Sequence, residues 1–287
     1  MPRCLFVTDL HGCPDRYASL FEILRREPVD AVFLGGDLLP SAMLLATRLS
    51  FRHRDFLGDF LAPKLRSLRG ELGPRAPRIF TILGNDDGRA EEAMVLDLAW
   101  EGLWTYAHGA RHRLGSHPVY GYSMVPPSPF LLKDWERYDV SRYVDPGCVS
   151  PEEGRRSVPA APAVVRYGTI AADLAHITRS DDLSQAILLF HGPPYRTCLD
   201  RAALDGKSVD HVPLDVHVGS IAVRRFIEAR QPLLTLHGHI HESARLTGAW
   251  REQLGRTWIL GAAHDGPELC VVRFDTEALE DATRTLI

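Results

Sequence analysis

The chain has 287 residues, a formal net charge of −4, and 24% charged residues. A negative charge gives no general reason to bind nucleic acid, and the basic runs at 51–56 and 111–118 are more typical of solvated faces than of polyanion sites. No apolar run reaches the roughly 18 residues that would cross a membrane. The composition therefore indicates a globular protein for which neither nucleic acid nor a membrane is an expected partner.

The apolar runs and the amphipathic runs alternate in the first part of the chain. Strands are predicted at residues 4–9, 30–37 and 78–87, and helices at 15–27, 43–72 and 89–100. Strands that alternate with helices are the signature of an α/β fold.

The pattern shortens after residue 100. Residues 103–122 predict hairpin-like strands, and the prolines at 126, 127 and 129 predict a loop at 124–130. Regular structure resumes with predicted helices at 167–179 and 220–231, and predicted strands at 186–192, 233–239, 257–260 and 269–274. Neither a repeat nor a clean linker divides the chain, so we expect a single domain over 1–287 with a flexible loop insertion around 138–165.

The cysteines follow no metal or disulfide pattern. Five are scattered along the chain without a C-x-x-C pair, at Cys4, Cys13, Cys148, Cys198 and Cys270. The first residues run directly into a strand pattern without a signal peptide. We therefore expect a cytoplasmic protein with reduced thiols.

Polar side chains stand at or just beyond the ends of five of the predicted strands, most of them beside a glycine. They are Asp9 and His11, then Asp37, then Asn85 with Asp86 and Asp87, then His191, and finally His237, His239 and His241. Functional sites of α/β folds lie at the carboxyl ends of strands, and glycine allows close approach there. The three last histidines occupy alternate positions, so a strand through them would place all three imidazoles in one row.

These side chains have the chemistry of a metal site. Carboxylate, imidazole and amide ligands without thiolate suit Mn, Fe or Zn, and one ion needs three or four of them. Seven candidates are enough for two divalent ions about 3.5–4 Å apart, the usual arrangement for clamping a phosphoryl group. Two such ions, two aspartates and one hydroxide leave a net positive site that attracts an anionic phosphoryl group.

The motifs D-x-H, G-D, G-N, H-G and G-H-x-H, in this order from Asp9 to His241, resemble the calcineurin-like metallophosphoesterase superfamily. The stretches T-D-L-H-G, H-G-P-P-Y, H-V-G-S and G-H-I-H-E-S are similar to a branch related to cyclic-nucleotide phosphodiesterases. The resemblance implies a central β-sandwich flanked by helices, an α/β architecture.

The resemblance also implies a set of metal ligands. One ion would be held by Asp9, His11 and His241, the other by Asn85, His191 and His239, and Asp37 would bridge both. His237 has no ligand role in the family, which leaves two alternatives. It acts beside the site, as an orienting or catalytic residue, or it is a satisfied strand histidine.

The third motif departs from the family pattern. Asp86 stands where the family usually has the histidine assigned as proton donor to the leaving oxygen. A carboxylate beside two metal ions is a poor acid, and its charge repels a dianionic monoester more than a monoanionic diester. We therefore expect a dinuclear-metal phosphodiesterase for a small diester such as a cyclic nucleotide.

Other functions stay open at this stage. One alternative is a metal-binding scaffold without catalysis, against which the completeness of the seven ligand positions argues, and another is a phosphomonoesterase or protein phosphatase. Tyr195 and Arg196 follow a predicted ligand closely and are expected to meet the substrate with the loop at 124–130, with a surface role as the alternative. For His211 and His217 a surface-loop role is the preferred interpretation.

Overall fold

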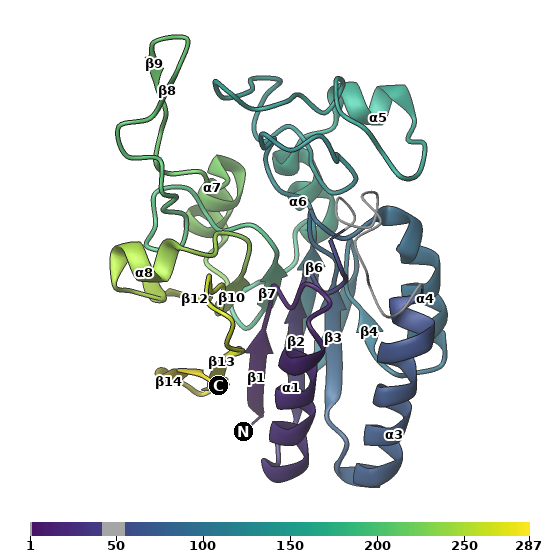
Figure 1. Cartoon of the computed structure of the whole chain (residues 1–287). Helices are drawn as coiled ribbons and strands as arrows, with labels where there is room; N and C mark the ends of the chain where they lie inside the picture. The colour runs from purple at the N-terminus through teal and green to yellow at the C-terminus, as the bar shows by residue number, and fades with distance from the viewer. Residues whose placement is uncertain (1, 42–54) are drawn as a thin grey trace.

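Two six-stranded sheets pack face to face at the centre of the computed structural model, which describes residues 2–41 and 55–287. Helices cover the outer faces of both sheets (Figure 1). The predicted central β-sandwich flanked by helices is thus confirmed.

The first sheet has the strand order β14-β13-β1-β2-β3-β4. Its strands are β1 (Arg3–Val7), β2 (Ala31–Gly35), β3 (Arg78–Ile82), β4 (Thr105–Tyr106), β13 (Cys270–Asp275) and β14 (Ala278–Leu286). Strands β1 to β4 are parallel, and β13 joins β1 in the antiparallel sense. The carboxyl ends of β1, β2 and β3 therefore meet at one edge.

The second sheet has the order β11-β12-β10-β7-β6-β5. Its strands are β5 (Arg111–Leu114), β6 (His117–Tyr122), β7 (Ile187–Phe190), β10 (Leu234–His237), β11 (Arg251–Leu254) and β12 (Thr257–Gly261). Strands β6, β7, β10 and β12 are parallel, whereas β5 and β11 are antiparallel additions at the two edges.

Successive residues of the central strands enter two different cores. In β1, Phe6 packs between the sheets, whereas Leu5 packs on the side of the helices. In β7, Leu189 packs between the sheets and Leu188 on the side of the helices. Burial on both faces explains why these strands read as continuous apolar runs rather than alternating ones.

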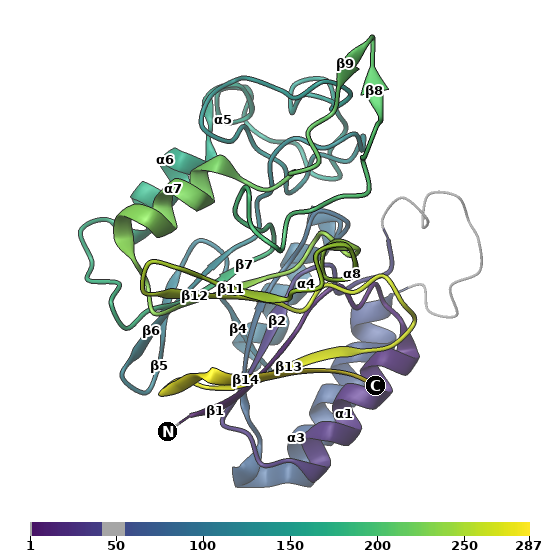
Figure 2. The ribbon, with the colours of Figure 1, turned by 90° about the vertical axis from the view of Figure 1, so that its left-hand side faces the viewer.

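The outer layers are helical. Helices α1 (Pro14–Arg26), α3 (Ala62–Leu72) and α4 (Glu92–Trp100) flank the first sheet, and α6 (Ile170–Thr178) and α7 (Ile221–Arg230) lie together over the second (Figure 2). Shorter elements are η1 (Leu57–Leu61), η2 (Gly73–Arg75), η3 (Arg89–Glu91), α5 (Pro162–Tyr167), α8 (Ser243–Thr247), β8 (Ser208–Val209) and β9 (Val212–Pro213). Within the described ranges, no helix has the length and apolar character needed to cross a membrane.

Several predicted elements need correction. The predicted helix at 167–179 is two helices, because α5 ends at Tyr167 and Thr169 caps a new helix by accepting a hydrogen bond from the Ala172 amide at 3.1 Å. The predicted helix at 43–72 is helical from Leu57, and its part at 43–54 lies outside the described residues. The predicted strand at 233–239 ends at His237.

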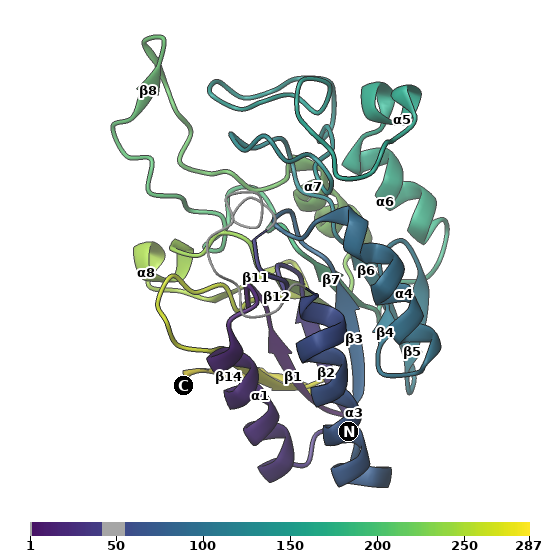
Figure 3. The same ribbon diagram turned by 45° about the vertical axis from the view of Figure 1, so that its right-hand side comes forward.

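The predicted insertion at 138–165 contains little regular structure. Tyr138 forms an isolated bridge with Thr169, and Arg155 forms one with Leu132. Figure 3 shows α5 and the loops around it above the carboxyl ends of the strands. Whether this segment is an insertion into a smaller domain stays a prediction.

Candidate metal centre

All seven predicted ligands lie just after the carboxyl ends of β1, β2, β3, β7 and β10. Ligand atoms of Asp9, His11, Asp37 and His241 lie within 4.8 Å of one another, and so do those of Asp37, His191 and His239. The two groups share Asp37. The seventh residue, Asn85, has its side-chain oxygen 3.0 Å from Nε2 of His191.

The backbone at four of these positions is left-handed. The φ angles are 56° at Asp9, 47° at His11, 51° at Asp37 and 76° at His239. This region is uncommon for residues other than glycine, and such conformations cluster at functional sites where the surroundings hold them.

Two glycines allow the ligands to pack this closely. A Cβ atom at Gly36, whose φ is 95°, would lie 2.7 Å from Nδ1 of His191. A Cβ atom at Gly238 would lie 2.8 Å from a carboxylate oxygen of Asp9. Any side chain at either position would displace a ligand.

The tautomer of His191 follows from its contacts. Its Nδ1 lies 2.8 Å from the Gly35 carbonyl oxygen, which only accepts, so Nδ1 carries the hydrogen. The other nitrogen, Nε2, lies 3.3 Å from Oδ2 of Asp37 and close to Asn85. In the neutral ring the lone pair lies on Nε2, which faces the oxygens of Asp37 and Asn85, and this is the geometry of a metal ligand held by a backbone carbonyl.

His11 is held in a similar way by Asp86. Nε2 of His11 lies 3.3 Å from Nε2 of His241, and Nδ1 lies 3.3 Å from Oδ2 of Asp86. The hydroxyl of Ser41 donates to the other Asp86 oxygen at 2.7 Å. The sequence identified Asp86 as a departure from the family motif but did not predict that it contacts a ligand.

The carboxylates of the cluster are deeply buried. Asp9 is 1% and Asp37 is 3% exposed, and across residues 2–41 and 55–287 their only side-chain ion pairs are with histidines. Burial acts to raise the pKa of Asp37, but the nearby His191 and His11 outweigh it and hold the pKa well below its usual range.

The imidazoles show the reverse effect. Burial alone would lower the pKa of His11 and His191, but the carboxylates facing them, Asp86 and Asp37, raise the pKa of each to about 9. Desolvation lowers the pKa of His239 to about 3. Without a cation, protons on imidazoles thus compensate the buried negative charge.

The residues fit a divalent cation. Buried carboxylates without an arginine or lysine partner in the described part of the chain require compensating charge. The facing imidazole nitrogens and carboxylate oxygens are the donors that first-row divalent ions prefer.

Asp87 stabilises the loops that carry two of the predicted ligands. It is fully buried and accepts hydrogen bonds from the amides of Leu38, Leu39 and Gly84 at 2.8–3.2 Å. Burial, reinforced by the charge of Asp37, raises the pKa of Asp87 to about 7. Asp87 therefore ties together the two loops that carry Asp37 and Asn85, a role that its position in the motif did not reveal.

His237 does not join the cluster. It is 1% exposed, its ring stacks on Phe190, and its nitrogens lie 2.9 Å from the Gly192 carbonyl and 2.8 Å from the Thr235 hydroxyl. The prediction of one row of three imidazoles is wrong, because the strand ends at His237 and the chain then turns through His239.

The predicted substrate residues lie in the loop after β7. The Tyr195 hydroxyl donates to Asp215 at 2.6 Å, and the exposed Arg196 guanidinium lies 5.2 Å from the Tyr195 ring centre. Loop 124–130 is irregular, as predicted, and Val125 packs against Gly192 directly after His191.

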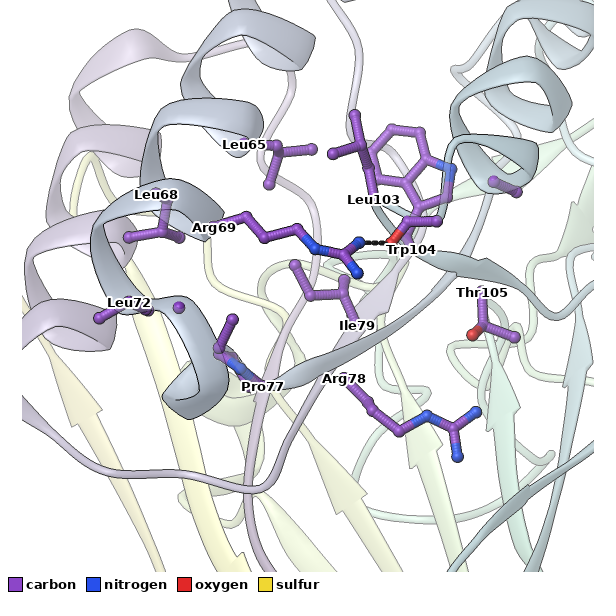
Figure 4. A pocket seen from close by; sticks show the side chains of 14 residues that line it. Leu65, Leu68, Arg69, Leu72, Pro77, Arg78, Ile79, Leu103, Trp104 and Thr105 are labelled. Atoms are coloured by element: carbon purple, nitrogen blue, oxygen red, sulfur yellow. Dashed lines mark hydrogen bonds between the residues drawn. The ribbon is translucent and has the colours of Figure 1, made fainter.

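A cavity of about 390 Å³ lies at the other end of the first sheet (Figure 4). Leu65, Arg69 and Trp104 line it, together with residues at the start of β3 and β4. The predicted ligands follow the opposite ends of the strands, so this cavity is separate from the metal centre.

Comparisons with known proteins found similar folds among solved structures. A comparison with curated proteins gave no match. Among solved structures, the protein TT1561 of Thermus thermophilus is similar at a TM-score of 0.57 and 16% identity, over 99% of this chain and 98% of that one. The phosphopantetheinyl hydrolase PptH from Mycobacterium tuberculosis is similar at a TM-score of 0.52 and 13% identity. The match covers 92% of this chain and 90% of that one.

These structural likenesses concern the fold. The family assignment comes from the calcineurin-like phosphoesterase model, which matches residues 2–243 and thus includes every predicted ligand. The chain belongs to the calcineurin-like phosphoesterase family.

Proposed function

We propose that this protein is a phosphodiesterase that uses two divalent metal ions to hydrolyse small phosphodiesters. Membership of the family makes it a phosphoester hydrolase. The observation that carries the finer proposal is the pair of ligand groups that overlap at Asp37.

Each group would hold one ion. Asp9, His11 and His241 would bind the first, and Asn85, His191 and His239 the second, with Asp37 shared. Ions bound there would supply positive charge that activates water and stabilises the phosphoryl oxygens. Mn, Fe and Zn all suit these donors.

The protein's own side chains would set the orientation of the ligands. Gly35 and Asp86 hold His191 and His11 through their Nδ1 atoms, which keeps each Nε2 directed into the cluster. Neither ring can turn away without losing its partner, so the site is preorganised for phosphoryl binding.

The preference for diesters rests on Asp86. Its side chain is 25% exposed, beside His11, where a substrate bound at the cluster would approach. A carboxylate there repels a doubly charged monoester about twice as strongly as a singly charged diester, because Coulomb energy follows the product of the charges.

A substrate panel tests the proposal. The protein, loaded with Mn²⁺, is assayed with aryl phosphomonoesters, aryl phosphodiesters, and 2′,3′- and 3′,5′-cyclic nucleotides. We expect turnover of diesters at a higher kcat/KM than that of monoesters. Full metal loading without turnover of any phosphoester would instead indicate a binding scaffold, and a preference for monoesters would overturn the diester assignment.

A further inference from the structure

A second histidine lies on a buried carboxylate in the loop between β7 and α7. Asp200 is 0% exposed and accepts hydrogen bonds from the amides of Arg196, Thr197 and Gly219 at 2.8–3.2 Å. Its only side-chain donor in the described part of the chain is His217, whose Nδ1 lies 2.8 Å from Oδ1.

This contact fixes the chemistry of the His217 ring. A carboxylate held by three amides can only accept, so Nδ1 of His217 carries a hydrogen. The half-buried ring leaves Nε2 without a hydrogen-bond partner among residues 2–41 and 55–287. A histidine oriented by a buried aspartate, with its other nitrogen free, is the arrangement used for proton transfer.

The loop that carries His217 is tied to the loops of two predicted ligands. Pro194, three residues after His191, forms a bridge with Ser220, three residues after His217. His217 itself pairs with Arg201.

A second contact connects this loop to the segment that carries His241. The Ala203 amide, two residues beyond Arg201, donates to Glu242 at 3.0 Å, directly after His241. Backbone and side-chain contacts therefore connect the loop of His217 to the segments that carry His191 and His241.

Among residues 2–41 and 55–287, the side chains considered for the acid role other than His217 are already engaged. Asp86 occupies the motif position of the proton donor and is engaged with His11 and Ser41. Both nitrogens of His237 are bonded away from the site, and Nε2 of His264 is paired with Glu268 at 2.9 Å. The other imidazoles of the cluster are candidate ligands.

We propose that His217 is the general acid that protonates the leaving oxygen, and that Asp200 positions it. This inference rests on the proposed phosphodiesterase function. Hydroxide attacks phosphorus, the bond from phosphorus to the leaving oxygen breaks, and its electron pair stays on that oxygen. The oxygen takes the Nε2 proton of the His217 imidazolium, which becomes neutral imidazole and regains a proton from water.

Asp200, Asp215 and Arg196 are charged residues that contact His217 or its neighbour Tyr195. Asp200 faces the ring directly, and Asp215 accepts from the His217 backbone amide at 2.9 Å and from the Tyr195 hydroxyl. The Arg196 guanidinium lies 5.2 Å from the centre of the Tyr195 ring, and that ring lies 6.2 Å from the ring of His217. Asp200 holds the ring through Nδ1, which leaves Nε2 as the nitrogen that can donate.

Dependence on the leaving group provides the test. His217→Asn keeps an amide hydrogen for Asp200 but lacks the second nitrogen. With a methyl diester, whose alkoxide leaves poorly, we expect kcat/KM to fall by about 10²–10⁴-fold. With a 4-nitrophenyl diester, whose phenolate needs no proton, the loss should stay below about tenfold.

Controls separate this inference from the proposed function. His176→Asn, at an exposed position on α6, should leave both rates unchanged, and metal content should match in all three proteins. Equal loss for both esters in His217→Asn, or no loss for either, overturns the acid role even if the wild-type protein is an active diesterase. Inactivity of the wild-type protein towards every phosphoester overturns both.

A second readout does not depend on turnover. Nitrogen-15 NMR of the metal-loaded protein should show the neutral His217 ring with its hydrogen on Nδ1. A hydrogen on Nε2 in the neutral ring would contradict the contact with Asp200 and overturn the proposal.

Discussion

Nδ1 of His11 lies 3.3 Å from Oδ2 of Asp86, so the residue that replaces the family's usual histidine contacts a predicted metal ligand. The position thus exchanges a proton donor for a group that orients His11 and adds negative charge beside it. A residue at this position can donate a proton or can place a negative charge beside the substrate. Substitutions of Asp86 distinguish these two roles by their effect on activity.

Replacing Asp86 by histidine should raise phosphomonoesterase activity relative to diesterase activity. The substitution removes the charge that repels a dianionic monoester and adds an imidazole able to donate a proton. The ratio of the two kcat/KM values should rise several-fold, measured on metal-loaded protein with metal content determined in parallel.

Asp86→Asn is the matched control for this change. It removes the charge but adds no acid, so it should raise the ratio by less than Asp86→His does. An unchanged or lower ratio in both variants would mean that the charge of Asp86 does not select between substrates.

Metal content should approach two ions per chain after reconstitution with Mn²⁺. Asp37→Asn should weaken both ions, because an amide lacks the charge of the carboxylate that the two ligand groups share. Asn85→Ala should weaken mainly one ion, because its side-chain oxygen lies 3.0 Å from Nε2 of His191, a predicted ligand of that ion.

Elemental analysis after dialysis measures these losses. His176→Asn is a suitable control, because His176 is exposed on α6 and is not a predicted ligand. A ratio of one ion per chain at full activity, or equal effects of Asp37→Asn and Asn85→Ala, would argue against the dinuclear arrangement.

Metal loading at pH 7 should release about two protons per chain. Neighbouring carboxylates raise the pKa of His11 and of His191 to about 9, so both rings are protonated at pH 7 without metal. Only the neutral imidazole binds a cation, so apparent affinity should increase as the pH rises from 7 towards 9 and level off above it.

Calorimetry in two buffers of different ionisation enthalpy gives the number of protons released. Binding enthalpies that do not depend on the buffer would show that the rings are already neutral at pH 7. His117→Gln, at a buried histidine whose ring contacts the Gln185 carbonyl, controls for general effects of losing an imidazole.

The sequence predicted the central strands and the chemistry of their ends because both depend on local pattern. Burial on two faces produces continuous apolar runs such as those ending at Val7 and Phe190, and polar residues after such runs stand out. Strands β11 and β14 escaped prediction, since these mostly polar segments pair at sheet edges through contacts with distant residues.

Details of the site were less predictable than its composition. Nothing local distinguishes His237, which packs on Phe190, from His239, which turns with φ at 76°. The contacts of Asp86 with His11 and of Asp200 with His217 join residues that only the folded loops bring together. Tertiary structure decides which of several similar side chains faces the cluster.

Lys133→Met should destabilise the protein by about 3–5 kcal/mol, because it leaves Glu136 buried without a counter-charge, with hydrogen bonds from Ser128 alone among the described residues. Both side chains are fully buried and form an ion pair, and the Lys133 amine also donates to the Ser128 carbonyl at 2.8 Å. This pair lies under the loop at 124–130. Urea denaturation measures the free energy of unfolding.

The double variant Lys133→Met with Glu136→Gln should recover much of the lost stability, because the uncompensated charge is removed as well. If the single and double variants were equally unstable, the cost would come from lost packing instead of from buried charge.

Arg196→Ala should raise KM several-fold without removing metal. The exposed guanidinium lies beside the Tyr195 ring, and the Asp200 carboxylate accepts a hydrogen bond from the Arg196 amide, five residues after the predicted ligand His191. A cation placed there attracts the anionic substrate but contacts no predicted ligand, so kcat should change little. Steady-state kinetics are compared with those of Arg225→Ala, an exposed arginine on α7. Equal kinetics in wild type and both variants, for every substrate that is turned over, would remove Arg196 from the binding site.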